Sequence, residues 1–428
     1  MAAPRTKATT AMALDDLRVP KGGGWITAAR EDALGRVKSM GLPQRRDEYW
    51  KFTRPDSLTQ AEAPPAAIFD DGDEPEMFGS FDRLRIVFTD GVFDAEASDD
   101  LDLEGVRIES LADAAAQDLH WARDIYGTLE ARGQSPVPRP LAALNTAQAQ
   151  DGVVIHVTGQ AARPVNLIHR HRSETSDAHL HVVVKLDAGA AFTLLENGPG
   201  AARFNTVMEV DVADGATFHH VRVQGRDHER RAATHVFGRL GEKSEFKSFT
   251  MTANGVLTRN ECVVEFTGDD ATAHVAGAVM GDGQFHQDDT VFVTHDAQRC
   301  ESRQVFKKVL RNGATGVFQG KILVKADAQK TDGYQISQAL LLDDDSQFLA
   351  KPELEIYADD VVCSHGSTTG AIDEDTLYYL RSRGVPRPIA TDMLVLSFLA
   401  HAVEEIAEED LRDEINARLS AWMERRRA

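Results

Sequence analysis

A short turn pattern recurs through the middle of this chain and restricts its fold more than any other feature of the sequence. Each copy has an acidic or glycine turn, followed by a small residue and an apolar residue. Four regular copies lie at residues 187–192, 213–218, 241–246 and 268–273, roughly 26 to 28 residues apart. Two further copies, at residues 313–318 and 344–348, follow at wider intervals. A repeat of this length is typical of solenoids and propellers, in which each copy builds one structural unit.

The segments between these turns predict β-strands that stack on one another. Runs rich in β-branched residues lie at residues 153–157, 180–186 and 207–212. Propeller blades need about 40 residues or more, so the shorter period favours a β-solenoid. A single coil cannot bury its apolar face alone, and stacking supplies the core. We therefore expect a mainly β protein with a β-helix core at residues 152–370, and a β-sandwich is the structural alternative.

Helical regions are expected before and after this core, where they can cover the ends of the stack. Residues 1–80 predict an N-terminal helical region and linker, with one helix at residues 25–40. Residues 81–151 predict a mixed connecting segment. Within this segment we expect a strand at residues 84–88 and a helical patch at about residues 110–132.

Two other segments carry specific helix predictions. Residues 45–52 are dense in charges and aromatic rings, and we interpret them as a helix that packs its rings inward in preference to a binding surface. Residues 371–428 predict a C-terminal helical domain. Its first helix follows the capping residue Asp373 and ends near Gly384.

Two more helices are predicted in this C-terminal domain. The helix at about residues 389–406 is apolar almost all round, which predicts that it is largely buried. The last helix has one apolar stripe, which is either docked on the solenoid or offered to another chain. The stripe consists of Leu411, Ile415, Leu419 and Trp422.

Composition excludes several classes of partner. The 428 residues carry a formal net charge of -21, which repels nucleic acid and anionic membranes. The three cysteines, an odd and low number, argue against a disulfide framework and fit a reducing compartment. No run approaches the ~20 apolar residues of a membrane span. No apolar segment follows Arg5 and Lys7 at the start, so we expect no secretory signal and a cytoplasmic location.

Common catalytic and metal motifs are missing or incomplete. The sequence has no phosphate-binding loop of the G-x-x-x-x-G-K-[ST] type, which argues against an ATPase, and no G-x-S-x-G nucleophile elbow. The pairs His169/His171 and His179/His181 would each place two imidazoles on one side of a strand. No third ligand follows at a recognisable spacing, so a metal site at either pair is the weaker hypothesis.

Cys363 and His365 form the most informative pair of side chains. On a strand, residues two apart project to the same side. A thiolate and an imidazole together suit iron or an iron–sulfur cluster. Two ligands do not hold a cluster, and a second chain would have to supply the others. The alternative is a buried cysteine beside a histidine in a turn.

Several segments resemble one family of proteins. Residues 354–370 and 377–384 resemble the C-terminal signature of the SufB/SufD family, which belongs to the SUF iron–sulfur cluster assembly machinery. The upstream segments 318–324 and 327–332 are similar too, and residues 45–53 resemble the family's entry motif. The Cys-Ser-His-Gly stretch favours the SufD branch of the family.

The resemblance implies a fold and a set of partners. It implies a right-handed parallel β-helix with helical regions at both ends. It also implies a complex with the paralogue SufB, joined through the β-helix, and with two copies of the ATPase SufC, bound through the C-terminal helices. A homodimer is an option for the isolated chain. Neither nucleic acid nor a membrane is an implied partner.

The resemblance also implies roles for the two side chains. His365 acts in cluster assembly at the SufB–SufD interface, together with a SufB cysteine, as a transient shared metal ligand. Cys363 is a second participant at this interface. The chain is then a non-catalytic scaffold with no permanent cofactor, which holds a transient iron–sulfur cluster only in the complex and depends on SufC for ATP hydrolysis.

Two rival functions belong to different classes. The first is a stand-alone β-helix enzyme acting on a polysaccharide, which would need a carboxylate-rich groove and usually a secretion signal. The second is a purely structural solenoid without a site, which would serve only as an anchor for SufC.

Overall fold

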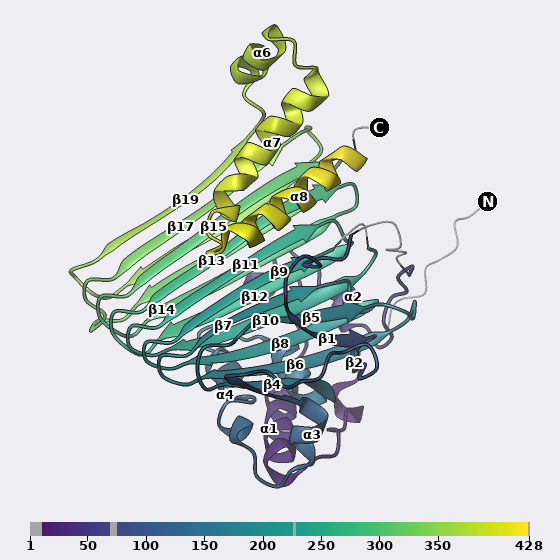
Figure 1. Cartoon of the computed structure of the whole chain (residues 1–428), viewed down its shortest axis with the longest axis vertical. Helices are drawn as coiled ribbons and strands as arrows, with labels where there is room; N and C mark the ends of the chain where they lie inside the picture. Colours follow the sequence, from purple (N-terminus) through teal and green to yellow (C-terminus); the bar gives the residue numbers. More distant parts are fainter. Residues whose placement is uncertain (1–10, 69–74, 226–227, 427–428) are drawn as a thin grey trace.

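Two parallel β-sheets that face each other form the body of the protein (Figure 1). The computed structural model describes residues 11–68, 75–225 and 228–426. From β4 to β19, consecutive strands alternate between the two sheets, so each coil contributes one strand to each sheet. Neighbouring strands within a sheet are parallel from β4 and β5 onward. This arrangement confirms the β-solenoid and excludes the sandwich of antiparallel sheets.

All the strands belong to one of these two sheets. The 10-stranded sheet contains β1 (Leu84–Thr89), β2 (Val92–Phe93), β5 (Val165–Arg170), β7 (Ala191–Asn197), β9 (Thr217–Gln224), β11 (Glu245–Ala253), β13 (Thr272–Asp282), β15 (Glu301–Arg311), β17 (Asp332–Leu341) and β19 (Val362–Gly370). The 9-stranded sheet contains β3 (Val106–Ser110), β4 (Asp151–Val157), β6 (Asp177–Leu186), β8 (Arg203–Val212), β10 (Arg231–Leu240), β12 (Leu257–Phe266), β14 (His286–His295), β16 (Thr315–Val324) and β18 (Gln347–Ile356).

The turn repeat sets the register of the stack. The apolar residues that close the four regular copies occupy equivalent positions on adjacent strands: Phe192, Phe218, Phe246 and Ala273. The ring centroids lie 6.3 Å apart for the first pair and 5.5 Å apart for the second. The two later copies enter β16 and β18, which belong to the opposite sheet. The wide interval before residue 313 therefore reflects a change of sheet, whereas the interval from there to residue 344 separates two neighbouring strands of the same sheet.

The turns stack on one another as well. Each copy uses one residue with a left-handed backbone, at φ 71° for Gly189, 65° for Gly215, 54° for Lys243 and 60° for Asp270. The amide of each of these residues donates to a carbonyl in the next turn along the stack, at 2.7 to 3.0 Å. The conformation is maintained by this ladder of hydrogen bonds even where the residue is not glycine.

Three strands before the expected start at residue 152 join the sheets. β1 pairs in parallel with β5, whereas β2 and β3 are antiparallel to β1 and β4. The connecting segment 81–151 thus supplies the first rung of the stack. The helical patch expected at residues 110–132 is divided into α3 (Leu111–Ala116), η3 (Trp121–Asp124) and α4 (Thr128–Arg132). Gly127, with φ at 71°, stands before α4.

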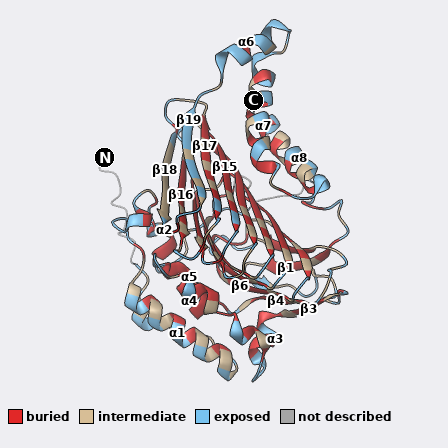
Figure 2. Cartoon of the chain, turned by 90° about the vertical axis from the view of Figure 1, so that its left-hand side faces the viewer, coloured by how far each residue is buried: buried red, intermediate tan, exposed pale blue. Residues whose placement is uncertain are grey.

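The N-terminal helices cover the outer face of the 9-stranded sheet (Figure 2). They are η1 (Leu14–Asp16), α1 (Gly24–Met40), η2 (Glu48–Trp50), α2 (Asp56–Thr59) and α5 (Pro140–Gln148). The helix predicted at residues 25–40 is confirmed as α1. The helix predicted at residues 45–52 is wrong, because only the short 3-10 turn η2 forms there. The rings of Tyr49 and Trp50 are nevertheless buried, as expected.

The C-terminal helices lie outside the 10-stranded sheet. They are α6 (Glu374–Ser382), α7 (Arg387–Val403) and α8 (Glu409–Arg425). Asp373 caps α6 by accepting a hydrogen bond from the Thr376 amide at 2.6 Å. The stripe of α8 is buried against the sheet, which settles that it docks on the solenoid.

The prediction that α7 is largely buried is wrong. One face of α7, including Val395 and Leu399, packs on the sheet. Its other face leaves Ile389 40% and Met393 48% exposed. None of the helices in the described part of the chain combines the length and the apolar character needed to cross a membrane.

Buried neutral histidines predict an acid-sensitive fold. Burial lowers the pKa of His228 to about 3, of His235 to about 4 and of His295 to about 3. The unfolded chain binds a proton at each of them near pH 6.5. Their stabilising contribution is therefore complete above about pH 6.5 and is lost progressively as the pH falls from there through the folded-state pKa values of about 3 to 4. Around pH 5, unfolding should take up about three protons at these sites, which is a slope of about 4 kcal/mol per pH unit.

Paired substitutions can check this slope. His295→Gln removes one buried titrating group, whereas His401→Gln removes an exposed one. We expect urea unfolding between pH 4.5 and 6 to show a slope smaller by about 1.4 kcal/mol per pH unit in the first variant only. Equal slopes in the two variants would contradict the neutral, buried state of His295.

Candidate functional site

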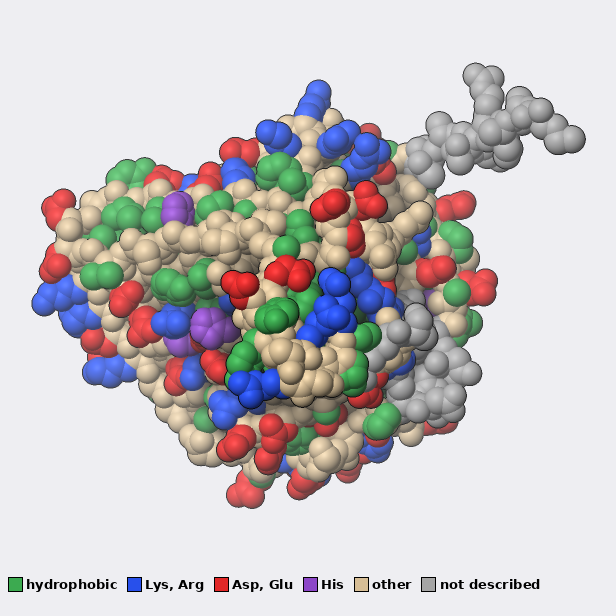
Figure 3. All heavy atoms as spheres, turned by 90° about the horizontal axis from the view of Figure 1, so that it is seen from above, with side chains coloured by type: hydrophobic (Ala, Val, Ile, Leu, Met, Phe, Trp, Pro, Cys, Tyr) green, Lys and Arg blue, Asp and Glu red, His purple; other side chains and the backbone are tan. Residues whose placement is uncertain are grey.

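The C-terminal end of the solenoid is open. β18 and β19 are the last strands of their sheets, and no strand in the described ranges pairs with their outer edges. Residues of β18 are mostly half-buried and those of β19 are mostly exposed, whereas the strands before them are buried (Figure 2). Seen from this end, hydrophobic side chains lie among charged ones (Figure 3). This end therefore presents two rows of free backbone groups and the interior of the last coil.

Cys363 and His365 lie together on this open coil, as the sequence predicts. Their register partners on β17 are Gly333 and Gln335. A Cβ atom on Gly333 would lie 3.2 Å from the Cys363 sulfur and 3.4 Å from Ile322 of the opposite sheet. Gly333 thus leaves room for the thiol between the two sheets. Because side chains two apart share a face, His365 also projects from the interior side of β19.

The two side chains differ in what they can do chemically. Cys363 is half-buried, and burial raises the pKa of its thiol above the ordinary value. The free chain therefore holds a protonated thiol there at neutral pH, which is a poor ligand and a poor nucleophile. His365 is exposed and presents an imidazole to solvent at the mouth of the coil. The arrangement therefore offers one available ligand, the His365 imidazole. The second, the Cys363 thiol, becomes a ligand only when a nearby cation or base favours its thiolate form.

Two buried glutamines lie in register with His365 on the neighbouring strands, and the sequence analysis did not identify them. Gln304, Gln335 and His365 are register partners on β15, β17 and β19. Both glutamine side chains are fully buried, and their amide atoms have no hydrogen-bond partner among the described residues. Gly320 on the opposite sheet accommodates the Gln335 amide, which a Cβ there would meet. The sequence signal that could have identified them is a glutamine at a strand position that projects into the core.

Three of the four histidines in the two other pairs contact side chains within the protein. His169 contacts Glu196 at 3.2 Å, and His171 contacts His228 at 2.7 Å. His181 contacts Glu209 at 2.8 Å, while His179 is only half-buried. In the ranges that the structure describes, no group of three or more His, Cys, Asp and Glu side chains could hold a metal ion.

The remaining cysteines are buried thiols. Cys262 and Cys300 lie in the core as free thiols. Burial raises the pKa of Cys262 to about 12 and that of Cys300 to about 11. Neither thiol ionises near neutral pH, so neither is a candidate for nucleophilic or metal chemistry.

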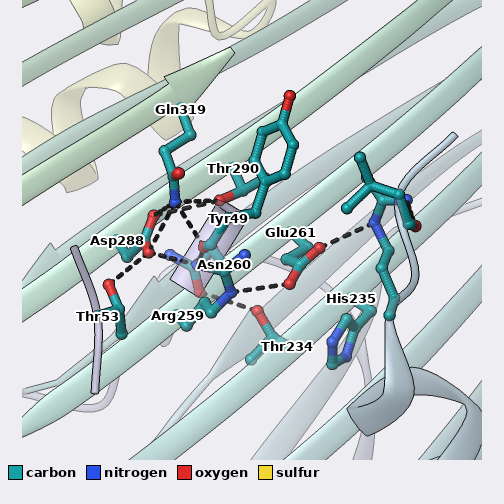
Figure 4. Close-up of polar contacts among 12 residues, drawn as sticks. Tyr49, Thr53, Thr234, His235, Arg259, Asn260, Glu261, Asp288, Thr290 and Gln319 are labelled. Carbon is teal, nitrogen blue, oxygen red and sulfur yellow. Dashed lines mark hydrogen bonds and ion pairs between the residues drawn. The ribbon is translucent and has the colours of Figure 1, made fainter. Parts of the chain in front are cut away.

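A buried polar network lies outside the 9-stranded sheet, where residues 45–53 meet β12, β14 and β16 (Figure 4). The Tyr49 carbonyl accepts hydrogen bonds from Arg259 and Gln319, each at 3.0 Å. The Thr53 hydroxyl donates to Asp288 at 2.5 Å. Arg259 also pairs with Asp288 and contacts the Trp50 ring, with 4.1 Å between the guanidinium carbon and the ring centroid.

The charges of this network are balanced. Glu261 accepts from Arg259 at 2.8 Å and from Arg139 at 2.8 Å. Burial alone would raise the pKa of Glu261, but these two guanidinium groups outweigh burial and lower it to about 2. Each buried charge has a partner, so the network docks the N-terminal segment and offers no free ligand.

A second exposed surface lies at the C-terminal helices. α6 stands away from the sheets at the open end of the molecule (Figure 1). Tyr378 and Tyr379 on α6 are 74% and 53% exposed, and the exposed Ile389 and Met393 of α7 follow them. Large exposed apolar side chains on a helix that packs on little else are typical of a surface that binds another protein.

The network predicts which change loosens the N-terminal region. Asp288→Ala removes one partner of Thr53 and one partner of Arg259, leaving part of a buried charge uncompensated. We expect the free energy of unfolding to fall by about 3 kcal/mol in urea titration. Trypsin should also cut faster at the exposed Arg45 and Arg46.

The matched control is Arg239→Met, which breaks a partly exposed pair with Asp211 on the same sheet. That change should cost about 1 kcal/mol or less and should leave the trypsin rate unchanged. Equal losses of stability in the two variants would show that the network does not hold this segment.

The chain is similar to one family of known proteins over most of its length. A family model described as "SUF system FeS cluster assembly, SufBD core domain" matches residues 169–398, and the model "SufBD protein N-terminal region" matches residues 80–166. The iron–sulfur cluster assembly protein SufD of Escherichia coli (strain K12) is 28% identical over 405 residues, covering 90% of each chain.

Two other relatives show the same extent of similarity. SufD of Bacillus subtilis (strain 168) is 24% identical over 409 residues, covering 91% of this chain and 92% of the relative. A SufBD family protein of Synechocystis sp. is 25% identical over 399 residues, covering 88% of this chain and 86% of the relative. The similarity therefore spans the solenoid and extends into both helical regions.

Proposed function

The chain belongs to the SufBD family of iron–sulfur cluster assembly proteins of the SUF system, and from this membership we propose that it is the SufD-type scaffold subunit of an assembly complex. In this role the chain pairs with SufB, binds the ATPase SufC and catalyses no reaction by itself. The cluster is the product that the complex builds, and it does not reside in this chain.

The open C-terminal coil is the observation that carries the proposal. Free strand edges bind other strands, and proteins that keep such edges usually cover them. A second solenoid of the same coil dimensions, such as SufB, can continue both sheets across β18 and β19. This pairing would bury the exposed Val362, at 70%, and Tyr357, at 63%.

His365 has a defined task in this arrangement. It stands on the last rung, and the described residues supply no third ligand beside it and Cys363, so it forms half of a site that SufB completes. An imidazole and a thiolate from the two chains would bind iron during assembly. Cys363 contributes less, because burial keeps its thiol protonated until a cation or a base lies beside it.

SufC has a separate surface in this proposal. The exposed tyrosines of α6 and the outer face of α7 lie beside the open coil and do not form part of it. A SufC subunit bound there would connect its ATP-driven movements to the sheet whose last strand carries His365, because α7 packs on β13 and β15 of that sheet.

The first test removes the imidazole. His365→Ala should leave the chain folded and the complex assembled, because the side chain is exposed and contributes little to the core. Iron and sulfide bound per purified complex should fall about ten-fold or more after anaerobic reconstitution. Cys363→Ser should reduce the loading less, because it removes a half-buried thiol that is protonated in the free chain.

The control for this test is Arg163→Gln, which changes a surface arginine paired with Asp82 at the first coils of the stack, away from β19 and the C-terminal helices. Its complex should load normally, and the melting temperatures of all three variants should stay close to that of the original protein. Normal loading in the His365→Ala complex would reject the site and leave the chain as a purely structural anchor.

The second test separates the two partner surfaces. Replacing Tyr378 and Tyr379 by Ala should weaken SufC capture about ten-fold or more, since exposed tyrosines are frequent binding hot spots. SufB pairing should be unchanged. Tyr357→Ala, at the open coil, should show the reverse pattern in pull-down assays with each partner. If both changes weakened the same partner, the assignment of separate surfaces would be wrong.

A further inference from the structure

Two buried glutamines stand in one row with His365 at the open end of the solenoid. Gln304, Gln335 and His365 occupy the same register position on β15, β17 and β19, which are neighbours in the 10-stranded sheet (Figure 1). Neighbouring strands lie about 4.8 Å apart, so each side chain of the row stacks on the next. Both glutamines are 0% exposed, and none of their amide atoms has a hydrogen-bond partner among the described residues.

The polar side chains that flank the glutamines have other partners in the described structure. Ser302 on β15 bonds to the His295 ring at 2.9 Å, and Ser337 on β17 donates to Ser367 at 3.1 Å. Behind the glutamines, the row continues with Val275 on β13, which is apolar. The amides are therefore not satisfied from the interior of the stack.

At this level, the described residues of the opposite wall offer no side-chain partner either. Gly320 on β16 faces Gln335, because a Cβ atom there would clash with the Gln335 amide oxygen. The register neighbours of Gly320 are Val291 on β14 and Pro352 on β18, whose side chains have no polar atom. The missing Cβ leaves room for the amide, which spans the interior at the level of His365.

His365 is the polar group that follows Gln335 in the row. A neutral imidazole holds a proton on one ring nitrogen and a lone pair on the other, so only the second can bind a metal. In metal sites the protonated nitrogen almost always donates to a carboxylate, a carbonyl or water, which fixes the tautomer and the orientation of the ring. The amide oxygen of Gln335 is an acceptor of this kind, on the same face and one strand away.

We propose that Gln335 is the positioning residue of His365. Its amide oxygen accepts a hydrogen bond from one ring nitrogen of His365, which leaves the lone pair of the other nitrogen for iron. Gln304 lies two strand spacings, about 10 Å, from His365 and does not reach the ring. The inference rests on the proposed function, because it assigns a partner to the imidazole that the assembly site uses.

The matched changes Gln335→Met and Gln304→Met test this proposal in the purified complex with SufB and SufC. Each replaces a fully buried amide without a partner by an apolar side chain of similar length, so neither should lower the melting temperature. The probe is Co²⁺ added to the cluster-free complex, and its binding at the site is the part of the absorption that His365→Ala removes. Gln335→Met should weaken this binding about ten-fold, because outer partners of metal-binding histidines have effects of that size. Gln304→Met should leave it unchanged.

Gln335→Glu is the variant that should rescue binding. Its carboxyl group keeps an acceptor oxygen at the same place whether or not it is protonated, so Co²⁺ should bind within about three-fold of the original affinity. A role in packing alone predicts the reverse order, because methionine suits an apolar interior better than glutamate does.

A further variant keeps the test readable if Gln335→Met does not fold. Gly320→Ala displaces the Gln335 amide without changing its chemistry, and it should also weaken Co²⁺ binding. Normal binding by a folded Gly320→Ala complex would then reject the proposal.

The outcomes separate this inference from the proposed function. If Gln335→Met binds Co²⁺ as the original complex does while His365→Ala does not, His365 acts without Gln335 and only this inference is wrong. Equal weakening by Gln335→Met and Gln304→Met would also reject it. If His365→Ala itself leaves Co²⁺ binding unchanged, the proposed site fails and the inference fails with it.

Discussion

A coil of a β-solenoid is stable only against another coil, and the rest of this structure follows from that constraint. Each coil here has one strand in each sheet, so its backbone groups and its inward side chains are satisfied by the coils before and after it. The ends of the stack are the places where this condition fails. The first end is closed by the antiparallel strands β2 and β3, whereas the last end leaves β18 and β19 without partners among the described residues. The candidate site lies at the end that is left open.

The two outer faces of the solenoid are covered in different ways, and these covers determine which surfaces remain free. The N-terminal segment is held on the 9-stranded sheet by paired buried charges around Arg259. The helix α8 is held on the 10-stranded sheet by an apolar stripe, with carboxylates of the α7–α8 turn fixed by histidines, such as Glu405 by His274 at 2.9 Å. The N-terminal cover reaches the face of β18, where Lys351 donates to Glu48 at 2.7 Å, but no described strand pairs with the free edges of β18 and β19. α6 is therefore left exposed next to the open edges, where a partner can contact both.

Much of this architecture could be predicted from local sequence patterns. The spacing of the turns fixed the coil length, and the phenylalanines that close them stack as the repeat implies. Strand periodicity placed Cys363 and His365 on one face. Features that depend on distant residues could not be predicted. The short 3-10 turn at Tyr49 forms because its carbonyl meets Arg259 and Gln319, more than 200 residues away in the chain. That Gln304 and Gln335 lie side by side with unpartnered amides depends on the pairing of β15 with β17, which their positions in the sequence do not show.

The central claim is that the open coil is half of a site that a second solenoid completes. Amide hydrogen exchange of this chain, alone and in complex with SufB, tests it most directly. The account predicts that pairing slows exchange in β19 (Val362–Gly370) and β18 (Gln347–Ile356) and leaves β1 and β3, at the other end of the stack, unchanged. Unchanged exchange in β18 and β19, together with new protection at β1 and β3 or at the helices outside the sheets, would contradict it.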